Sequence, residues 1–295
     1  MALRTFGTSD TVLLANGRED HLPDALAGNY LAGFEDAPIL LTDDGGVPAT
    51  TQSALDALGA TRVIILGGTD AVSAEQEAAL EARYVVERVG GLDRYETARL
   101  IALEPGPGNV NAATAIIARG DAFPDALVSG PIAFRSQFPI LLVRPDAAGA
   151  ATTMTLSGLN IERVIIAGGT DAVSVAVADE VRRSLGDDGR VDRVAGPNRQ
   201  ETSVAIADLA TGELGFPRLH VNLANGGRVV DALTGGPHAG REGSVILLTE
   251  NSNVLGGAAE EYLATAPSTL KGGHVFGGTE ALSDALVGAA TDAAD

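Results

Sequence analysis

The chain has 295 residues, of which 45% are hydrophobic, and it carries a formal net charge of −19 at pH 7. This hydrophobic content excludes a disordered chain, and the length allows two or three packed domains. The absence of cysteine excludes disulfides and thiolate chemistry, and the acidic charge, with Lys271 as the only lysine, disfavours nucleic-acid binding.

The first elements of the chain alternate between strand and helix patterns. TVLLAN (11–16), PILLT (38–42) and RVIILG (62–67) are short, continuously apolar runs, typical of strands buried on both faces. LPDALAG (22–28) and TQSALDALGA (51–60) between them predict crossover helices. Strands that alternate with helices in this way predict a parallel sheet with right-handed crossovers.

These elements then recur twice in the same order. PILL begins at position 38 and recurs at 139, a shift of 101 residues, and the DAL and GGT motifs shift equally. The third copies, VVDAL, VILLT and HVFGGT, follow 106, 106 and 109 residues further on. Constant order across three elements indicates a triplicated unit. We therefore predict an α/β fold of three tandem modules, each a small parallel sheet flanked by helices, over residues 1–91, 92–196 and 197–295.

A further segment joins the modules. VERVGGLDRYETARLIA (86–102) recurs as VDRVAGPNRQETSVAIA (191–207), and each copy predicts a short strand, a glycine turn, an Asp or Asn helix cap and a helix. Only two copies are present for three modules, so we expect the first module to lack its leading helix.

The motifs GGLDRYETA, FPDALVSGP, PILL and strand-GGTDAVS, in that order, resemble the type 2 cell-wall-binding repeat family over nearly the whole chain. The resemblance implies Toprim-like three-layer modules that pack around a pseudo-threefold axis. It also implies non-covalent attachment to an anionic wall polymer, an extracellular location at the cell wall or cell surface, and association with an enzyme or adhesin domain. No signal peptide and no transmembrane segment are recognised in this chain.

Three departures distinguish the modules. The first has AGNY where the second has VSGP, its loop before the DAL motif is two residues longer, and the third has VVDAL in place of FPDAL. These differences predict that the three modules do not carry equivalent binding sites.

The GGTDAVS motif at 67–73 admits two interpretations. A glycine turn before a helix is able to hold an anion on free N–H groups. The motif lacks the spacing of a dinucleotide fold and the lysine of a P-loop, so we favour a structural role. Gly67 and Gly68 then turn the chain, and Ser73 caps a helix with Gln76 completing a capping box. The equivalent caps are Ser174 and Ser283.

Three repeated residue types are candidates for polymer binding. The GGT threonines offer hydroxyl groups, and the DAL aspartates either stabilise a helix start or ligate a cation. Arginine grips carboxylate, phosphate or pyruvylated sugar, or forms an internal ion pair at the module junction. Arg88 and Arg193 carry the same ambiguity. The candidate set is Arg94, Arg199, Asp24, Asp125, Asp231, Thr69, Thr170 and Thr279.

No catalytic residue, metal site or cofactor is predicted. His21, His220, His238 and His274 recur at no shared position, and neither HExxH, GxSxG nor Asp-x-Asp is present. The leading hypothesis is a non-catalytic protein that anchors to an anionic cell-envelope glycopolymer, with divalent cations or salt offsetting the acidic charge. The alternatives are a structural surface-layer protein that makes lattice contacts, and an enzyme that acts on a small phosphorylated substrate at the GGT turns.

Overall fold

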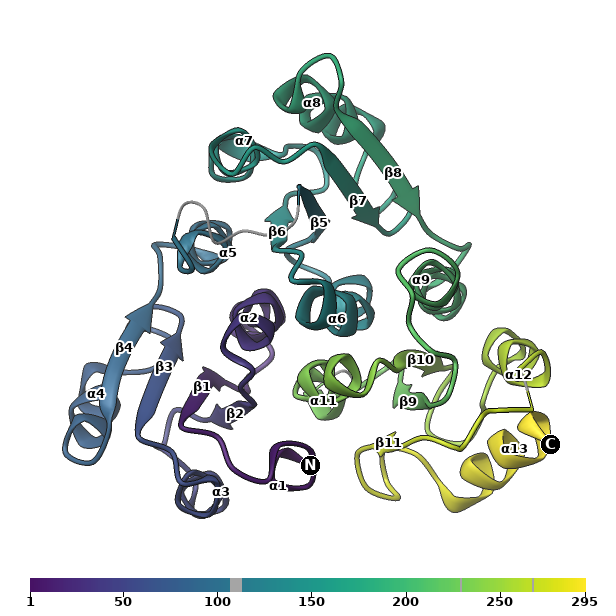
Figure 1. Cartoon of the computed structure of the whole chain (residues 1–295), viewed down its shortest axis with the longest axis horizontal. Coiled ribbons are helices and arrows are strands. Elements are labelled where there is room, and N and C mark those ends of the chain that lie inside the picture. Colours follow the sequence, from purple (N-terminus) through teal and green to yellow (C-terminus); the bar gives the residue numbers. More distant parts are fainter. Residues whose placement is uncertain (107–112, 229, 267) are drawn as a thin grey trace.

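Three separate sheets, each built only of parallel strands, lie at the corners of a triangle (Figure 1). The structure is a computed structural model that describes residues 1–106, 113–228, 230–266 and 268–295, and it leaves out the side chains of Val230 and Asp231. The predicted α/β fold of three repeats, arranged around a pseudo-threefold axis, is confirmed, because each repeat contributes one sheet.

The first two sheets share one topology, with strand orders β2-β1-β3-β4 and β6-β5-β7-β8, and the third has the order β10-β9-β11. Central strands are apolar because helices cover both of their faces; Leu13, for example, lies between Ile39 and Ile64 and all three are buried. The strands are β1 (Thr11–Asn16), β2 (Ile39–Thr42), β3 (Arg62–Leu66), β4 (Val85–Val89), β5 (Thr114–Arg119), β6 (Ile140–Val143), β7 (Arg163–Ala167), β8 (Arg190–Val194), β9 (Val221–Asn225), β10 (Val245–Thr249) and β11 (Val275–Phe276).

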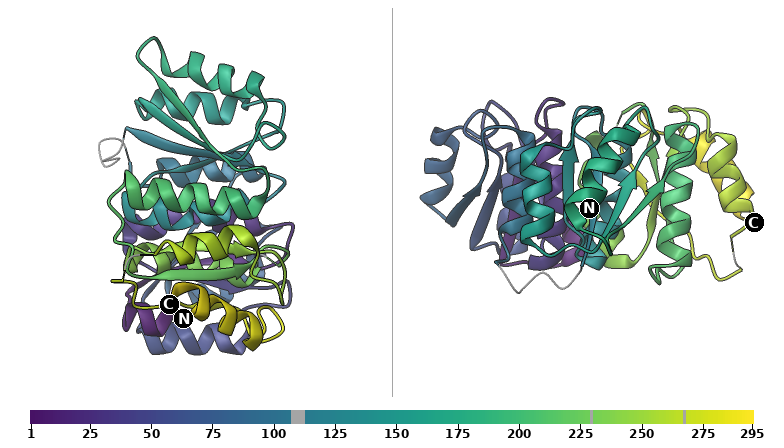
Figure 2. Two further views of the ribbon diagram at one scale, coloured as in Figure 1. Left: turned by 90° about the vertical axis from the view of Figure 1, so that its right-hand side faces the viewer. Right: turned by 90° about the horizontal axis from the view of Figure 1, so that it is seen from above.

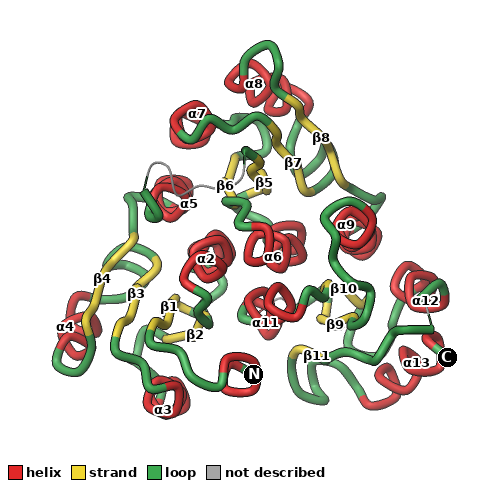
Figure 3. The backbone as a smooth tube through the Cα atoms, in the orientation of Figure 1, coloured by secondary structure: helices red, strands yellow, loops and turns green. Residues whose placement is uncertain are grey.

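Each sheet lies between an inner and an outer layer of helices, as the tube drawing in Figure 3 makes plain. Figure 2 shows that strands and helices run roughly along the viewing direction of Figure 1, so that the connecting loops gather on two opposite faces. The inner helices are α2 (Leu22–Glu35), α6 (Pro124–Ser136) and α11 (Gly235–Glu242), the last preceded by the short α10 (Val230–Leu233). The outer helices are α3 (Ala49–Leu58), α4 (Ala74–Glu81), α7 (Gly149–Gly158), α8 (Val175–Leu185), α12 (Gly257–Ala264) and α13 (Asp284–Ala294).

One helix lies at each junction between modules. α5 (Arg94–Leu103) contacts α2 of the first module as well as β6 and α7 of the second, and α9 (Arg199–Gly212) contacts α6, β10 and α12 in the same manner. The chain begins with a single short helix, α1 (Ala2–Phe6), which contacts α3 and α11. α1 therefore lies between the third and first modules at the place that corresponds to α5 and α9.

The inner helices approach closely because small residues line their contacts. A Cβ atom at Gly33 of α2 would lie 2.0 Å from the carbonyl oxygen of Phe134 on α6. A larger residue at this position would force the two backbones apart. Among the described residues, no helix combines the length and apolar character that crossing a lipid bilayer requires.

Candidate ligand-binding site

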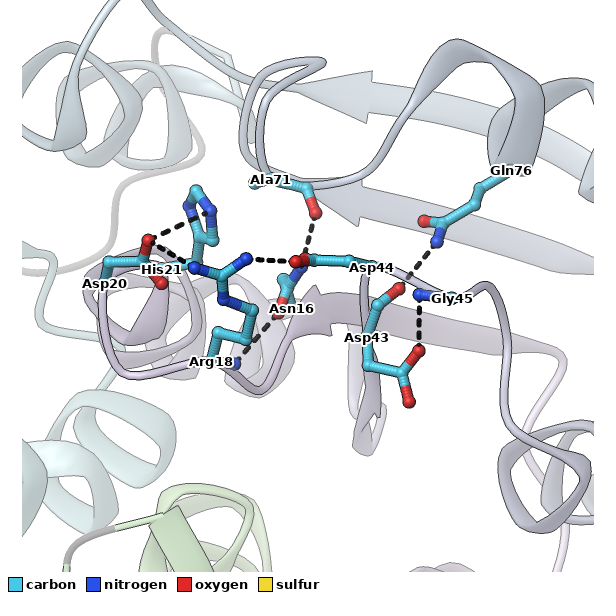
Figure 4. Close-up of polar contacts among 9 residues, drawn as sticks. All are labelled: Asn16, Arg18, Asp20, His21, Asp43, Asp44, Gly45, Ala71 and Gln76. Carbon is cyan, nitrogen blue, oxygen red and sulfur yellow. Dashed lines mark hydrogen bonds and ion pairs between the residues drawn. The ribbon is translucent and has the colours of Figure 1, made fainter.

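Polar side chains join the carboxyl ends of the strands in the first sheet (Figure 4). Asn16, the last residue of β1, donates from Nδ2 to the carbonyl of Ala71 (2.7 Å) and to the carboxylate of Asp44 (3.0 Å). Its Oδ1 accepts from the backbone N–H of Arg18 (2.9 Å), and the Arg18 guanidinium pairs with Asp44. One buried amide therefore fixes the loops that follow β1, β2 and β3 relative to one another.

The third module repeats this arrangement. Asn225 ends β9, donates to the carbonyl of Ala281 (2.7 Å) and accepts from the N–H of Gly227 (2.8 Å). In the second module the position is Arg119, which pairs with Asp121. The shared Asn at the end of TVLLAN and VNLAN is the signal in the sequence that marks this position, and it lies outside the candidate set predicted from the repeats.

The GGT turns follow the carboxyl ends of β3, β7 and β11. Their first glycines, Gly67, Gly168 and Gly277, have φ values of 105°, 111° and 112°. Only glycine adopts this region without strain, so the triplicated glycine has a backbone cause. The backbone N–H of Gly67 donates to the carbonyl of Val89 on β4 (2.9 Å), so this N–H is not available to bind an anion.

Arginines of the following strand hold two of these turns. Arg88 of β4 donates from Nη1 to the carbonyls of Gly67 (2.9 Å) and Gly68 (3.1 Å), and it also pairs with Glu77 (2.8 Å). Arg193 of β8 makes the matching contacts to the carbonyls of Gly168 (2.8 Å) and Gly169 (3.0 Å). Because the turns present carbonyls to a guanidinium, these contacts are structural.

The predicted helix caps are confirmed in all three modules. The hydroxyl of Ser73 accepts from the N–H of Gln76 (3.2 Å), and Ser174 and Ser283 accept from the N–H groups three residues on (3.3 Å each). The predicted capping box is wrong. The Gln76 side chain donates to the carbonyl of Asp43 (2.6 Å; Figure 4), because the loop after β2 lies within its reach.

The DAL aspartates lie in the first turns of α2 and α6, as predicted, and beneath the glycine turns. A carboxylate oxygen of Asp24 lies 2.5 Å from the position of a Cβ atom at Gly67, and Asp125 has the same relation to Gly168. Burial raises the pKa of Asp24 to about 7 against the opposing effects of Arg94 and a Thr97 hydrogen bond. Burial also raises the pKa of Asp125 to about 6, although Arg199 acts in the opposite direction. The side chain of Asp231 lies outside the described residues.

Arg94 and Arg199 begin the junction helices and bind backbone carbonyls. Arg94 donates to the carbonyl of Gly120 (2.7 Å), after β5, and to that of Asp20 (3.2 Å), in the first module. Arg199 donates to the carbonyl of Gly226 (2.7 Å), after β9. The alternative of an internal ion pair at the module junction is wrong for both arginines, since neither pairs with a carboxylate among the described residues and Glu96 pairs with Arg99 (2.7 Å).

A cleft of about 750 Å³, here called the first cleft, lies between the carboxyl edge of the first sheet and the start of α5. It brings together three predicted site residues, Asp24, Thr69 and Arg94, from two modules. Thr69 is exposed on its turn, so its hydroxyl is free to meet a ligand. The other acidic residues of the lining are Asp20, Asp70, Asp93 and Glu96.

A second cleft of about 1090 Å³ lies between the start of α9 and the start of α12. Asn198, Gln200 and Glu201 line one side of it and Glu250 and Glu261 the other. None of the predicted site residues lines this cleft. Thr170 and Thr279 are exposed on GGT turns that do not line it. Both clefts are acidic and polar, which suits the recognition of sugar hydroxyl groups by carboxylate and amide side chains.

Comparison with known proteins identifies the repeats. The sequence matches the family "Cell wall binding domain 2 (CWB2)" three times, over residues 2–77, 88–178 and 193–287. The chain belongs to the cell wall binding domain 2 family. Each CWB2 match covers the strands of one sheet from its first strand to its GGT turn. The chain is thus a cell-wall-binding module that associates with the cell wall or cell surface.

Two curated relatives come from Bacillus subtilis (strain 168). The N-acetylmuramoyl-L-alanine amidase LytC is 26% identical over 254 residues, which are 86% of this chain and 48% of that protein. A protein named amidase enhancer is 28% identical over 246 residues, which are 83% of this chain and 32% of that protein. The CWB2 chain spans about half, or less, of the length of these relatives.

Two solved structures from Clostridium difficile share the fold. Cwp8 superimposes with a TM-score of 0.81 at 26% identity, covering 98% of this chain and 48% of Cwp8. Cwp6 superimposes with a TM-score of 0.83 at 25% identity, covering 98% of this chain and 45% of Cwp6. The triangular arrangement of three CWB2 modules is therefore common to these chains.

Proposed function

We propose that this CWB2 chain is a non-catalytic anchor that holds an anionic cell-envelope glycopolymer non-covalently in clefts at its module junctions. The observation that carries the proposal is the first cleft, where Asp24, Thr69 and Arg94 converge from two modules. The modules extend over residues 1–91, 92–196 and 197–295, and the membership of the strands in three sheets supports these boundaries.

The acidic lining indicates how the polymer is held. Carboxylates accept hydrogen bonds from sugar hydroxyls but repel acidic groups of the polymer, and Arg94 already donates to two carbonyls. Divalent cations that bridge cleft carboxylates and polymer anions resolve this repulsion. Several weak contacts at separate clefts then add to a firm attachment through multivalency.

A non-catalytic role agrees with the chemistry of the first cleft. A carboxyl group with a raised pKa in a cleft is a typical candidate acid or base. Asp24, however, packs beneath Gly67, and Asp125 packs in the same way beneath Gly168. Burial between helix and turn therefore accounts for the raised pKa of both carboxyl groups. Any further activity then belongs to an associated enzyme or adhesin domain, and the likeness to an amidase supports the association with an enzyme.

Retention on purified wall sacculi tests the function. We expect the chain to sediment with sacculi in Ca²⁺ or Mg²⁺ and to be released by EDTA. Release by competing wall polymer, without any dependence on chelator, would favour direct recognition of hydroxyls. No sedimentation under either condition would overturn the proposal, and ordered self-assembly without polymer would support a surface-layer lattice instead.

A pair of variants tests the cleft itself. Thr69→Arg places bulk at the mouth of the first cleft, whereas Thr61→Arg places the same side chain at the opposite end of β3. Both threonines are exposed, so both variants should fold. We expect retention on sacculi to fall about tenfold for Thr69→Arg only. Equal retention of the two variants would exclude the first cleft as the binding site.

A further inference from the structure

Two histidines and a glutamate meet at the junction between the third and first modules. His238 and Glu242 lie four residues apart on α11, and His274 directly precedes β11. Only 2% of the His238 side chain, 16% of the His274 side chain and 33% of the Glu242 side chain are exposed. These histidines match no repeat position and form no HExxH motif, so the sequence alone predicts no metal site here.

The spacing of the three ligand atoms fits one metal ion. His238 Nε2 lies 3.0 Å from His274 Nδ1 and 3.4 Å from a carboxylate oxygen of Glu242, and that oxygen lies 3.9 Å from His274 Nδ1. Ligand atoms in a tetrahedral zinc site are about 3.4 Å apart, since each lies about 2.0–2.1 Å from the metal. The point that lies in the plane of the three atoms and is equidistant from them is about 2.0 Å from each, within the range for zinc–nitrogen and zinc–oxygen bonds.

Outer contacts orient the His238 ring and hold the backbone of His274 in place. His238 Nδ1 lies 2.6 Å from the hydroxyl of Thr5 on α1, which leaves Nε2 to face His274 and Glu242. The backbone N–H of His274 donates to Oδ1 of the buried Asn222 (3.0 Å), which fixes the segment before β11. A hydrogen bond to the second ring nitrogen, as His238 makes to Thr5, is typical of histidines that bind metals in proteins.

A simple hydrogen bond between the histidines explains less. One N–H between His238 and His274 gives a hydrogen bond to those two nitrogens alone, yet His238 Nε2 faces both His274 and Glu242. A cation satisfies all three ligand atoms together. The nearby Arg4 opposes a dication electrostatically, so we expect an affinity weaker than that of closed structural zinc sites.

We propose that His238, Glu242 and His274 bind one divalent transition-metal ion of the Zn²⁺ class, with one coordination position open. The ion links α11 to the segment before β11 within the third module, on the side where Thr5 of α1 contacts His238. Its role is structural, and it is independent of wall binding.

Co²⁺ titration of the full chain, stripped with EDTA and desalted, tests the site. We expect one equivalent of Co²⁺ to give the visible absorption of a four-coordinate ion, and one equivalent of Zn²⁺ to abolish it. With Zn²⁺ at about a hundredfold excess over its Kd, Tm should rise by about 5 °C. A folded chain that gives neither signal would overturn the proposal.

Variants assign the ligands. Glu242→Gln and His274→Gln lie at partly exposed positions and should fold, and each should lose the Co²⁺ spectrum and the Zn²⁺-dependent rise in Tm. His21→Gln, which removes a histidine from the first cleft, should keep both. Thr5→Ala should weaken Co²⁺ binding several-fold by freeing the His238 ring. Binding that survives both ligand variants, or that His21→Gln abolishes, would contradict the assignment.

Discussion

The side-chain oxygen of Asn29 lies 2.0 Å from the position that a Cβ atom at Gly236 would occupy. Asn29 is on α2 and Gly236 on α11, and Gly130 of α6 contacts the same amide, with its Cβ position 3.1 Å away. The three residues hold equivalent positions, since each follows the aspartate of its module's DAL motif by five residues. The AGNY departure of the first module therefore places an asparagine side chain against the matching glycines of the other two modules.

This relationship predicts a coupled pair of substitutions. Gly236→Ala should lower the free energy of unfolding by about 2–3 kcal/mol, because the methyl group and the Asn29 amide compete for one space. Asn29→Gly in the same chain should recover most of that loss. Chemical denaturation of both single variants and the double variant measures the coupling. Additive effects would show that the two residues do not compete, and Gly288→Ala, in open space on α13, serves as control.

The two glycines of one turn should respond differently to alanine. Gly168→Ala introduces a side chain at φ 111° and 2.5 Å from an oxygen of Asp125, and should cost about 2–3 kcal/mol. Gly169→Ala meets no atom within 4 Å and should change stability by less than about 1 kcal/mol. Thermal and urea unfolding of the pair provides the comparison, and equal losses would argue against a backbone cause for the repeated first glycine.

Asp24 should make stability depend on pH. Its folded pKa of about 7 is higher than the pKa of about 3.9 in an unfolded chain, so its contribution to stability is complete below pH 4 and is lost as pH rises to 7. Asp24→Asn removes this loss. We expect the variant to equal the wild type at pH 4 and to exceed it at pH 8 by about 2–4 kcal/mol.

Unfolding measured from pH 4 to 8 tests this difference. Asp125→Asn should follow the same course with a smaller gain, because burial raises the pKa of Asp125 only to about 6. A difference between Asp24→Asn and the wild type that does not vary with pH would show that Asp24 is not buried as described.

Removing the arginine that holds a GGT turn should destabilise the second module. Arg193→Ala leaves the carbonyls of Gly168 and Gly169 without their guanidinium donor, at a cost of about 1–3 kcal/mol. Arg190→Ala, three residues earlier at the start of β8, loses only a surface pair with Asp192 and should cost less than about 1 kcal/mol. Hydrogen exchange of the 168–174 backbone should increase in Arg193→Ala alone.

The sequence predicted the features that depend on local burial and on repetition. Continuous apolar runs such as TVLLAN marked the central strands because helices cover both faces, and the serine of GGTDAVS marked its cap because capping is local. The partners of long polar side chains were not predictable in this way. Gln76 donates to the carbonyl of Asp43 and Arg94 donates to that of Gly120 only because the folded chain brings these carbonyls within reach. The His238–His274 contact likewise depends on how α11 lies against β11.

The junction helices have a consequence for how the chain is divided. α5 follows the last strand of the first sheet, yet it packs on β6 and α7 of the second sheet while its other side covers α2 of the first. A cut between consecutive repeats at residue 91 therefore leaves apolar surface exposed on both products. Because α5 and α9 each pack on elements of two neighbouring modules, we expect the three modules to unfold together and not one at a time.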